Sequence, residues 1–337
     1  MKKKNKYKTL LVSAALLALF GCGCGKQASE EELAYRTLGI ESMEAGDYEG
    51  AVAAFEAALQ GHIGWITKTE IDISYYKAAA QYAAGDKEGA LATYDALLDY
   101  DKEDGNAYYM RGCLLLGQGD SEAALSDFSA AVNYNSEDYE LYVSIYENLS
   151  AYGLAEQGEA YLNKAFGIKG NSADNLAWRG KLYSMLGQYD NAKKELSAAL
   201  EKGSALANLY LAKVYEAEGD MERAQTLYQT YLELGEESPE AMNALAELEI
   251  QRGNYAQALL YVNQGLSMKE VPNRKELMQN QILACEYTGD FAGAWAAVQE
   301  YMALYPEDST MQREYTFLKY RQGFPQGQEE IAPEGEP

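Results

Sequence analysis

The sequence has few residues that break helices and few that carry out catalysis. It contains six prolines, four cysteines and one histidine, His62, in 337 residues. So few prolines among abundant Ala, Leu, Glu and Tyr predict one long helical architecture. There is no Cys/His pair, glycine-rich phosphate loop or metal-ligand spacing, and Cys113 and Cys285 lie far apart. We therefore predict that the chain is not an enzyme, binds no metal or cofactor, and contains no disulfide framework.

Positive charge is scarce as well. Lys and Arg number 28 against 52 Asp and Glu, giving a formal net charge of -24. Five of the lysines lie in the first eight residues, so a chain without them would have 23 basic groups and a net charge of -29. This charge repels nucleic acid and favours cationic partners, although solvated acidic helix faces would have the same composition. Charge alone identifies no partner.

The N-terminus has the layout of a targeting segment. The basic segment Met1 to Lys8 precedes an apolar run, Thr9 to Gly21, which has signal-peptide length and is too short to span a bilayer. The sequence Leu-Phe-Gly before Cys22 resembles the lipobox of bacterial lipoproteins, although the family prefers a small residue in place of Phe20. Cys24 is a competing acceptor, and an ordinary secretory signal is the alternative to both.

The lipobox resemblance implies a place for the protein. Residues 1–21 would be a signal peptide, and Cys22 would be diacylated and become the new N-terminus. Two acyl chains give stable anchoring, whereas one gives only marginal binding. The chain would then be attached to a bacterial cell membrane and face outside the cytoplasm, with residues 22–31 as a polar linker.

A repeat extends along the remainder of the chain. A Gly is followed five residues later by a small residue, with a large apolar residue four positions further on. The spacings between successive units are 39, 34, 34, 34, 32, 34 and 36 residues. The eight pairs are Gly46/Ala51, Gly85/Ala90, Gly119/Ala124, Gly153/Gly158, Gly187/Ala192, Gly219/Ala224, Gly253/Ala258 and Gly289/Ala294.

This pattern resembles the tetratricopeptide repeat, in which each unit of 34 residues forms two antiparallel helices. The residues that fall on the family's consensus positions are, in the first unit, Tyr35, Leu38, Gly39, Gly46, Tyr48, Ala51, Phe55 and Ala58, and in the third Tyr108, Gly112, Ala124, Phe128 and Ala131. The resemblance implies an all-α, right-handed superhelical solenoid of about eight units over residues 32–308. We expect a capping helix over 309–322 and a disordered acidic tail over 323–337.

The residue types at the repeat positions have physical reasons. Each repeat Gly is expected to end the first helix in a left-handed conformation, which only glycine adopts cheaply. In six repeats the next residue is Asp or Asn, whose side chain is expected to cap the second helix. These residues are Asp47, Asp86, Asp120, Asp220, Asn254 and Asp290.

Small residues are expected to face large ones within each helix pair. Gly39, Gly112 and Gly180 would let paired helices approach closely, while residues such as Phe55 and Phe128 fill the space between them. Such a pair buries too little surface to fold alone, so neighbouring units must stack. The fourth unit replaces the small residue with Tyr146 and has Gly158 in place of Ala, which predicts more widely spaced helices.

The resemblance also implies where a partner binds, because solenoids of this family bind extended peptides along the concave surface formed by the first helices. The residues at the lining positions are mostly apolar and aromatic in the early repeats and mostly acidic in the later ones. The candidates are Arg36, Ile40, Met43, Tyr75, Tyr82, Asn106, Tyr109, Leu116, Glu140, Glu147, Lys181, Lys213 and Glu247. The same positions hold Asp72, Cys113, Val143, Asp174, Leu209, Glu216, Glu240, Asn243, Glu276, Gln279, Glu286 and Tyr287.

Several alternatives stay open. Tyr75, Tyr82 and Tyr109 either contact a partner or pack between helices. The insertion Gly61 to Thr69, with His62 and Trp65, is either a contact loop or an extended second helix with a buried Trp. We expect an adaptor that binds a protein or peptide, and the acidic lining positions would suit a basic one. The other hypotheses are a receptor for a soluble peptide or cell-wall fragment, and a passive spacer. The sequence indicates no oligomeric state.

Overall fold

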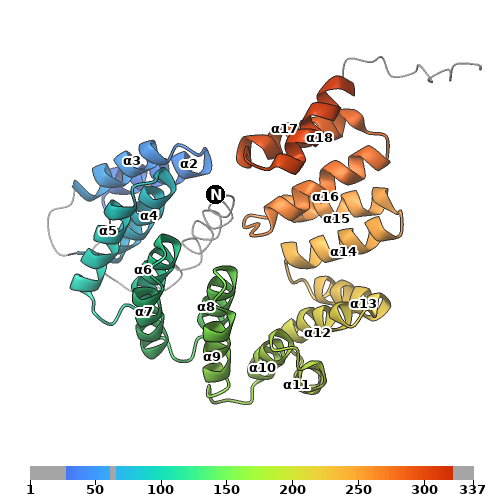
Figure 1. The fold of residues 1–337 in the computed structure, drawn as a ribbon, viewed down its shortest axis with the longest axis horizontal. Coiled ribbons are helices and arrows are strands. Elements are labelled where there is room, and N and C mark those ends of the chain that lie inside the picture. Colours follow the sequence, from blue (N-terminus) through green and yellow to red (C-terminus); the bar gives the residue numbers. More distant parts are fainter. Residues whose placement is uncertain (1–27, 61–65, 322–337) are drawn as a thin grey trace, which may run out of the picture. The chain divides into compact units, whose positions relative to one another are not determined.

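A computed structural model describes residues 28–60 and 66–321, and within these ranges the chain forms 17 helices and no strands. The helices pack in consecutive pairs, which confirms the predicted all-helical class of helix-turn-helix units (Figure 1). In each pair we call the even-numbered helix the first helix and the odd-numbered one the second. The chain divides into two compact units, residues 1–170 and 171–337.

The unit formed by residues 1–170 contains four helix pairs. They are α2 (Glu30–Glu44) with α3 (Tyr48–Gln60), α4 (Lys68–Ala84) with α5 (Lys87–Tyr100), α6 (Gly105–Gln118) with α7 (Ser121–Tyr134), and α8 (Tyr139–Ala151) with α9 (Ala155–Ala165). Helix α2 begins slightly before the predicted start of the repeats, because Ser29 accepts a hydrogen bond from the backbone N–H of Glu32 and so caps it.

The unit formed by residues 171–337 contains four pairs and a final helix. They are α10 (Ala173–Met185) with α11 (Tyr189–Glu201), α12 (Leu206–Ala217) with α13 (Met221–Glu233), α14 (Pro239–Gln251) with α15 (Tyr255–Leu266), and α16 (Arg274–Tyr287) with α17 (Phe291–Leu304), followed by α18 (Ser309–Arg321). Helix α18 packs against α17 and buries Leu318 completely, as expected of a capping helix.

The glycine of each repeat marks the turn between the paired helices. Gly85 and Gly119 end α4 and α6 with φ of 94° and 90°, and the other six repeat glycines also have positive φ. Asp86 then caps α5 by accepting a hydrogen bond from the backbone N–H of Gly89 at 2.9 Å. The aspartates at the other four predicted positions cap their helices in the same way.

The capping prediction is wrong at Asn254. Its side chain makes no capping hydrogen bond to α15, and instead its amide Nδ2 donates to the Oε2 atom of Glu249 at 2.8 Å. A cap would use the Oδ1 atom of Asn254 as acceptor, whereas the bond to Glu249 uses its Nδ2 as donor, and this charge-assisted bond fixes the orientation of the amide.

Small residues face large ones within the helix pairs, as predicted. An added Cβ on Gly39 or Gly112 would lie 2.4 Å or 2.8 Å from the ring of Phe55 or Phe128. In the fourth repeat the two sizes exchange places. A Cβ on Gly158 would lie 3.2 Å from the Cα of Tyr146, so the two helices approach closely and the predicted wider spacing is wrong.

Several predictions concern residues outside the described ranges. These are the signal peptide, Cys22 and Cys24, the contact-loop or buried-Trp alternatives for His62 and Trp65, and the acidic tail from residue 323 onward. Among the described residues, no helix combines the length and the apolar character required to cross a membrane.

Candidate functional site

The tyrosines of the predicted groove in the first unit lie between helices. Tyr75, Tyr82 and Tyr109 are each less than a tenth exposed. Tyr75 donates its phenolic hydrogen to Asp104 at 2.7 Å, and Tyr109 accepts a hydrogen bond from the Nδ2 atom of Asn148 at 2.9 Å. Both bonds join the first helices of consecutive repeats. Tyr75 and Tyr109 therefore link neighbouring repeats.

Burial keeps Tyr75, Tyr109 and Cys113 uncharged. It raises the pKa of Tyr75 and Tyr109 far above the usual range and raises the pKa of the Cys113 thiol to about 12. The apolar candidates Leu116 and Val143 are buried in the same layer. At physiological pH these groups are neutral, so they supply packing and neutral hydrogen bonds.

Polar candidates in the first unit are exposed, Asn106 and Glu140 at the start of their helices and Glu147 within α8. Asn106 accepts a hydrogen bond from the Nδ2 atom of Asn135 at 3.2 Å. Ile40 and Met43 are half-buried against the first repeat's core.

Arg36 and Asp72 form an ion pair between α2 and α4. The Nε atom of Arg36 lies 2.5 Å from the Oδ2 atom of Asp72, and its guanidinium lies 5.3 Å from the ring centre of Tyr76. Burial raises the pKa of Asp72 even though Arg36 acts in the opposite direction. Arg36 is therefore held by its own chain.

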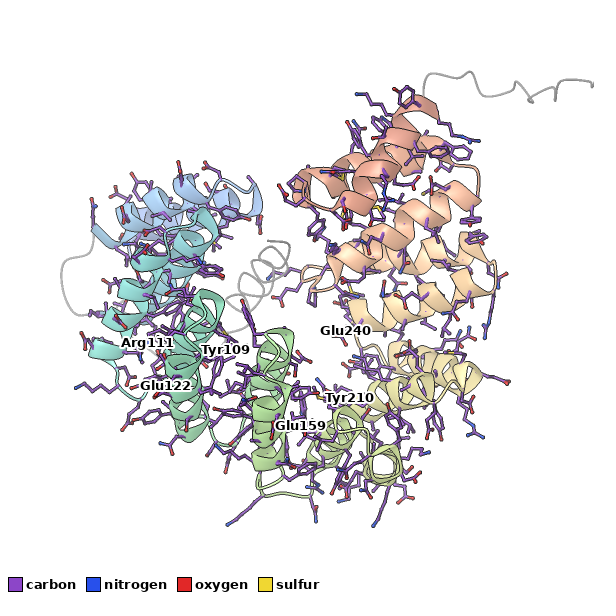
Figure 2. All side chains as sticks on the ribbon, in the orientation of Figure 1. Tyr109, Arg111, Glu122, Glu159, Tyr210 and Glu240 are labelled. Atoms are coloured by element: carbon purple, nitrogen blue, oxygen red, sulfur yellow. The ribbon has the colours of Figure 1, made fainter. Side chains whose placement is uncertain are left out.

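In the second unit, α10, α12 and α14 place two lysines beside aromatic rings and a carboxylate. The ammonium of Lys181 lies 4.8 Å from the ring centre of Trp178 and 5.1 Å from that of Tyr210. Lys213 forms an ion pair with Glu240, with 2.5 Å between the Nζ and Oε2 atoms. Glu240 and Tyr210 are labelled in Figure 2. Burial opposes ionisation of Glu240, but Lys213 and Lys181 outweigh it and lower its pKa.

Two further carboxylates, Glu216 on α12 and Glu247 on α14, accept hydrogen bonds from neutral donors. The buried ring of Tyr228 donates its phenolic hydrogen to the Oε2 atom of Glu216 at 2.7 Å. Asn243 donates to the Oε1 atom of Glu247 at 2.7 Å and accepts a hydrogen bond from Asn280 at 2.9 Å. Within the described ranges, neither Glu216 nor Glu247 forms an ion pair.

The pKa of Tyr228 shows how close these carboxylates lie. It is raised above its usual range, first by burial, then by the hydrogen bond to Glu216 and by the negative charges of Glu216, Glu240 and Glu247. Three carboxylates from α12 and α14 therefore surround one buried phenol. We call Lys213, Glu216, Glu240 and Glu247 the acidic face.

Sequence reasoning found the charged members of the acidic face and missed the residues that hold them. Neither Tyr228 nor Asn280 was predicted to belong to a site. The one signal in the sequence was the spacing of 37 residues between Asn243 and Asn280, close to one repeat. The ring of Tyr228 is buried in the core while its hydroxyl binds Glu216. In the sequence such a tyrosine looks the same as one that only packs.

Comparison with known families agrees with the paired helices and the repeat spacing. Three models described as tetratricopeptide repeat match residues 42–111, residues 105–138, and residues 179–239 and 215–275. The chain is a tetratricopeptide repeat protein, a member of a family of interaction scaffolds. A search of curated proteins gives no match.

Solved structures with the same kind of fold are distant in sequence. A tetratricopeptide repeat protein from Parabacteroides merdae is 15% identical, with 86% of this chain and all of that chain covered and a TM-score of 0.42. The human IFIT1 dimer with m7Gppp-AAAA is 15% identical, covering 94% of this chain and 85% of that one, with a TM-score of 0.50. PilW, a type IV pilus biogenesis factor, is 17% identical, covering 62% and 97%, with a TM-score of 0.45. At these identities the likeness concerns the fold alone.

Proposed function

We propose that this protein is a membrane-anchored extracytoplasmic scaffold that binds a basic segment of a protein partner on the acidic face of α12 and α14. The observation that carries the proposal is the pair Glu216 and Glu247, which are oriented by neutral donors and left without a cation in the described chain. Each carboxylate has lone pairs left to accept hydrogen bonds from a ligand.

A basic side chain fits this arrangement better than an acidic or apolar one. Tyr228 and Asn243 fix the two carboxylates before binding, so little side-chain entropy remains to be lost when a cation arrives. An arginine can bond a carboxylate through two N–H groups at once, which adds both strength and orientation. An exposed ion pair contributes only about 0.2–1 kcal/mol, so the affinity needs several contacts along the partner.

The lysines set the register of such a partner. Lys213 already neutralises Glu240, and Lys181 lies close enough to lower the pKa of Glu240 as well. A basic residue placed there would meet two positive charges, whereas one placed between Glu216 and Glu247 would meet two negative ones. Repulsion at one end and attraction at the other favour a single alignment.

The membrane anchor in this proposal depends on the sequence of the N-terminus. A lipid on Cys22 would leave a short polar tether before α2 begins at Glu30. The scaffold would then act on partners close to the membrane surface. Two acyl chains are enough for stable attachment.

Photo-crosslinking in intact cells tests the binding face. A photoreactive residue replaces the exposed Glu240 on the acidic face, which leaves Tyr228 and Asn243 in place to orient Glu216 and Glu247, and in a matched control it replaces the exposed Glu222 at the start of α13. We expect a specific crosslinked protein from position 240 and not from 222, lost when E216Q and E247Q are combined. The same crosslinks from both positions, or crosslinks that persist in the double variant, would contradict the proposed face.

Membrane fractionation tests the anchor separately. We expect the wild-type chain in the membrane fraction and the C22A variant in the soluble extracytoplasmic fraction. A C24A variant serves as the control and should remain with the membrane. If C22A stays attached while C24A is released, the lipid is on Cys24, and if both stay attached the anchor proposal fails.

A further inference from the structure

An open cavity of about 650 Å³ lies between α7, α8 and α9 of the first unit. One wall is a single face of α7, because Ser126, Ser129 and Asn133 recur at helical spacing. Tyr142 of α8 and Lys164 of α9 complete the lining. The hollow is open to solvent, so a ligand bound there would stay partly exposed.

In the preceding repeat, an ion-pair network joins the second helices α5 and α7. Arg111, labelled in Figure 2, reaches from α6 to Asp127 of α7 through two hydrogen bonds of 2.8 Å and 2.7 Å, and to Asp95 of α5 through one of 2.7 Å. The guanidinium therefore links α5 to α7.

One repeat later the same three positions hold neutral residues. Shifting by 34 residues replaces Asp95, Arg111 and Asp127 with Ser129, Ile145 and Tyr161. Ile145 is fully buried and places no charged group between α7 and α9. Tyr161 instead donates its phenolic hydrogen to the backbone carbonyl of Leu125 at 3.2 Å. The cavity occurs where the ion-pair network is missing.

The polar groups of the cavity are available to a ligand. Within the described chain, the side chains of Ser126, Ser129 and Asn133 make no hydrogen bond to another residue. Tyr142 has one weak bond, to the carbonyl of Ser136 at 3.3 Å. Hydroxyl and amide groups both donate and accept, so they match a ligand that is itself rich in hydroxyls.

Lys164 gives the cavity its charge. Its ammonium lies 4.9 Å from the ring centre of Tyr161, and within the described ranges it forms no ion pair. An anionic group on a ligand would be the natural counter-ion.

We propose that this cavity binds an acidic sugar, with its carboxylate on Lys164 and its hydroxyls along the Ser126, Ser129 and Asn133 face of α7. That face extends over about 10 Å, given a rise of about 1.5 Å per residue, which is enough for more than one sugar ring. A simple anion would use the lysine alone, and a neutral sugar would leave the lysine unpaired. The cavity belongs to the first unit and the acidic face to the second, and this proposal is independent of the function proposed for that face.

Isothermal titration calorimetry on the full-length chain in detergent micelles tests the affinity, with glucuronate, glucose and acetate as probes. We expect glucuronate to bind at least tenfold more tightly than glucose or acetate, since only glucuronate has both the carboxylate and the hydroxyls. Hydrogen exchange should show protection in α7 and α9 on addition of glucuronate.

Variants locate the site. K164M should weaken glucuronate binding about tenfold, and K164R should preserve it to within about threefold because the charge remains. S129D should also weaken it about tenfold, because it restores the carboxylate of the neighbouring repeat beside Lys164. K102M removes an exposed lysine elsewhere in the unit and should have no effect.

Four outcomes would overturn the proposal. Acetate as tight as glucuronate would indicate an anion site without sugar recognition, and glucose as tight would remove the role of Lys164. Protection only outside α7, α8 and α9 would place binding elsewhere. An unchanged affinity in K164M, with helical content equal to that of the wild type by circular dichroism, would also refute it.

Discussion

Replacing Arg111 with methionine should destabilise the first unit by about 3 kcal/mol. The guanidinium makes two hydrogen bonds to Asp127, whose side chain is only 7% exposed, and one to Asp95. Removing one partner of a buried pair costs about 3–5 kcal/mol, because the other charge stays buried without compensation. We take the lower end of this range because the side chain of Arg111 is itself 24% exposed. The methionine retains much of the packing of the arginine stem.

Urea unfolding combined with hydrogen exchange measures this cost. Exchange at α5, α6 and α7 is needed because repeat proteins can unfold piecewise, so one global transition need not report a local loss. R223M is the matched control, since the side chains of Arg223 and Asp220 are 67% and 36% exposed, and it should cost less than about 0.5 kcal/mol.

A second set of variants distinguishes a lost charge pair from general damage. D127N in the R111M background should recover part of the stability, because the buried charge is removed as well. The triple variant D95S, R111I and D127Y copies the residues of the next repeat and should recover more. A cost for R111M equal to that of R223M, or no recovery in D127N, would refute the reasoning.

Three further predictions concern packing, pH and thiol reactivity. G112A should cost about 1–3 kcal/mol, because its Cβ would lie 2.8 Å from Phe128, and F128V should relieve part of that cost in thermal unfolding. Burial opposes ionisation of Asp308, yet hydrogen bonds from Lys275 and Tyr301 lower its pKa to about 2, so it should contribute about 2 kcal/mol above pH 4 that is lost as pH falls toward 2. Acid titration of D308N should lack this loss. Because burial raises the pKa of Cys113 to about 12, peptide mapping after iodoacetamide at pH 8 should find it unmodified in the folded chain and modified in urea.

The repeat architecture was predictable because its determinants are local. A glycine that ends one helix, the aspartate that begins the next, and a small residue facing a large one all recur at nearly constant spacing. Asn254 shows the limit of this reasoning. Its capping role was displaced by Glu249, whose position relative to the amide is set by the three-dimensional fold.

The groove was harder to predict because lining positions do not determine which side chains reach solvent. Tyr75 and Tyr109 occupy lining positions, yet each finds a hydrogen-bond partner on the next first helix and is buried there. Glu216 and Glu247 were identified by position alone. Their orientation depends on Tyr228 and Asn243, and the spacings of the two bonds, 12 and 4 residues, do not follow the repeat.

The bonds between neighbouring first helices also bear on the behaviour of the scaffold in different media. Tyr109 with Asn148 in the first unit, and Asn243 with Asn280 in the second, join successive repeats without formal charge. Salt screens exposed charges over about 8 Å at physiological ionic strength but has little effect on neutral, partly buried hydrogen bonds. The angle between these repeats should therefore hold from dilute to concentrated salt, while binding at the acidic face weakens. Ionic strength would then regulate occupancy of that face without altering the repeats that present it.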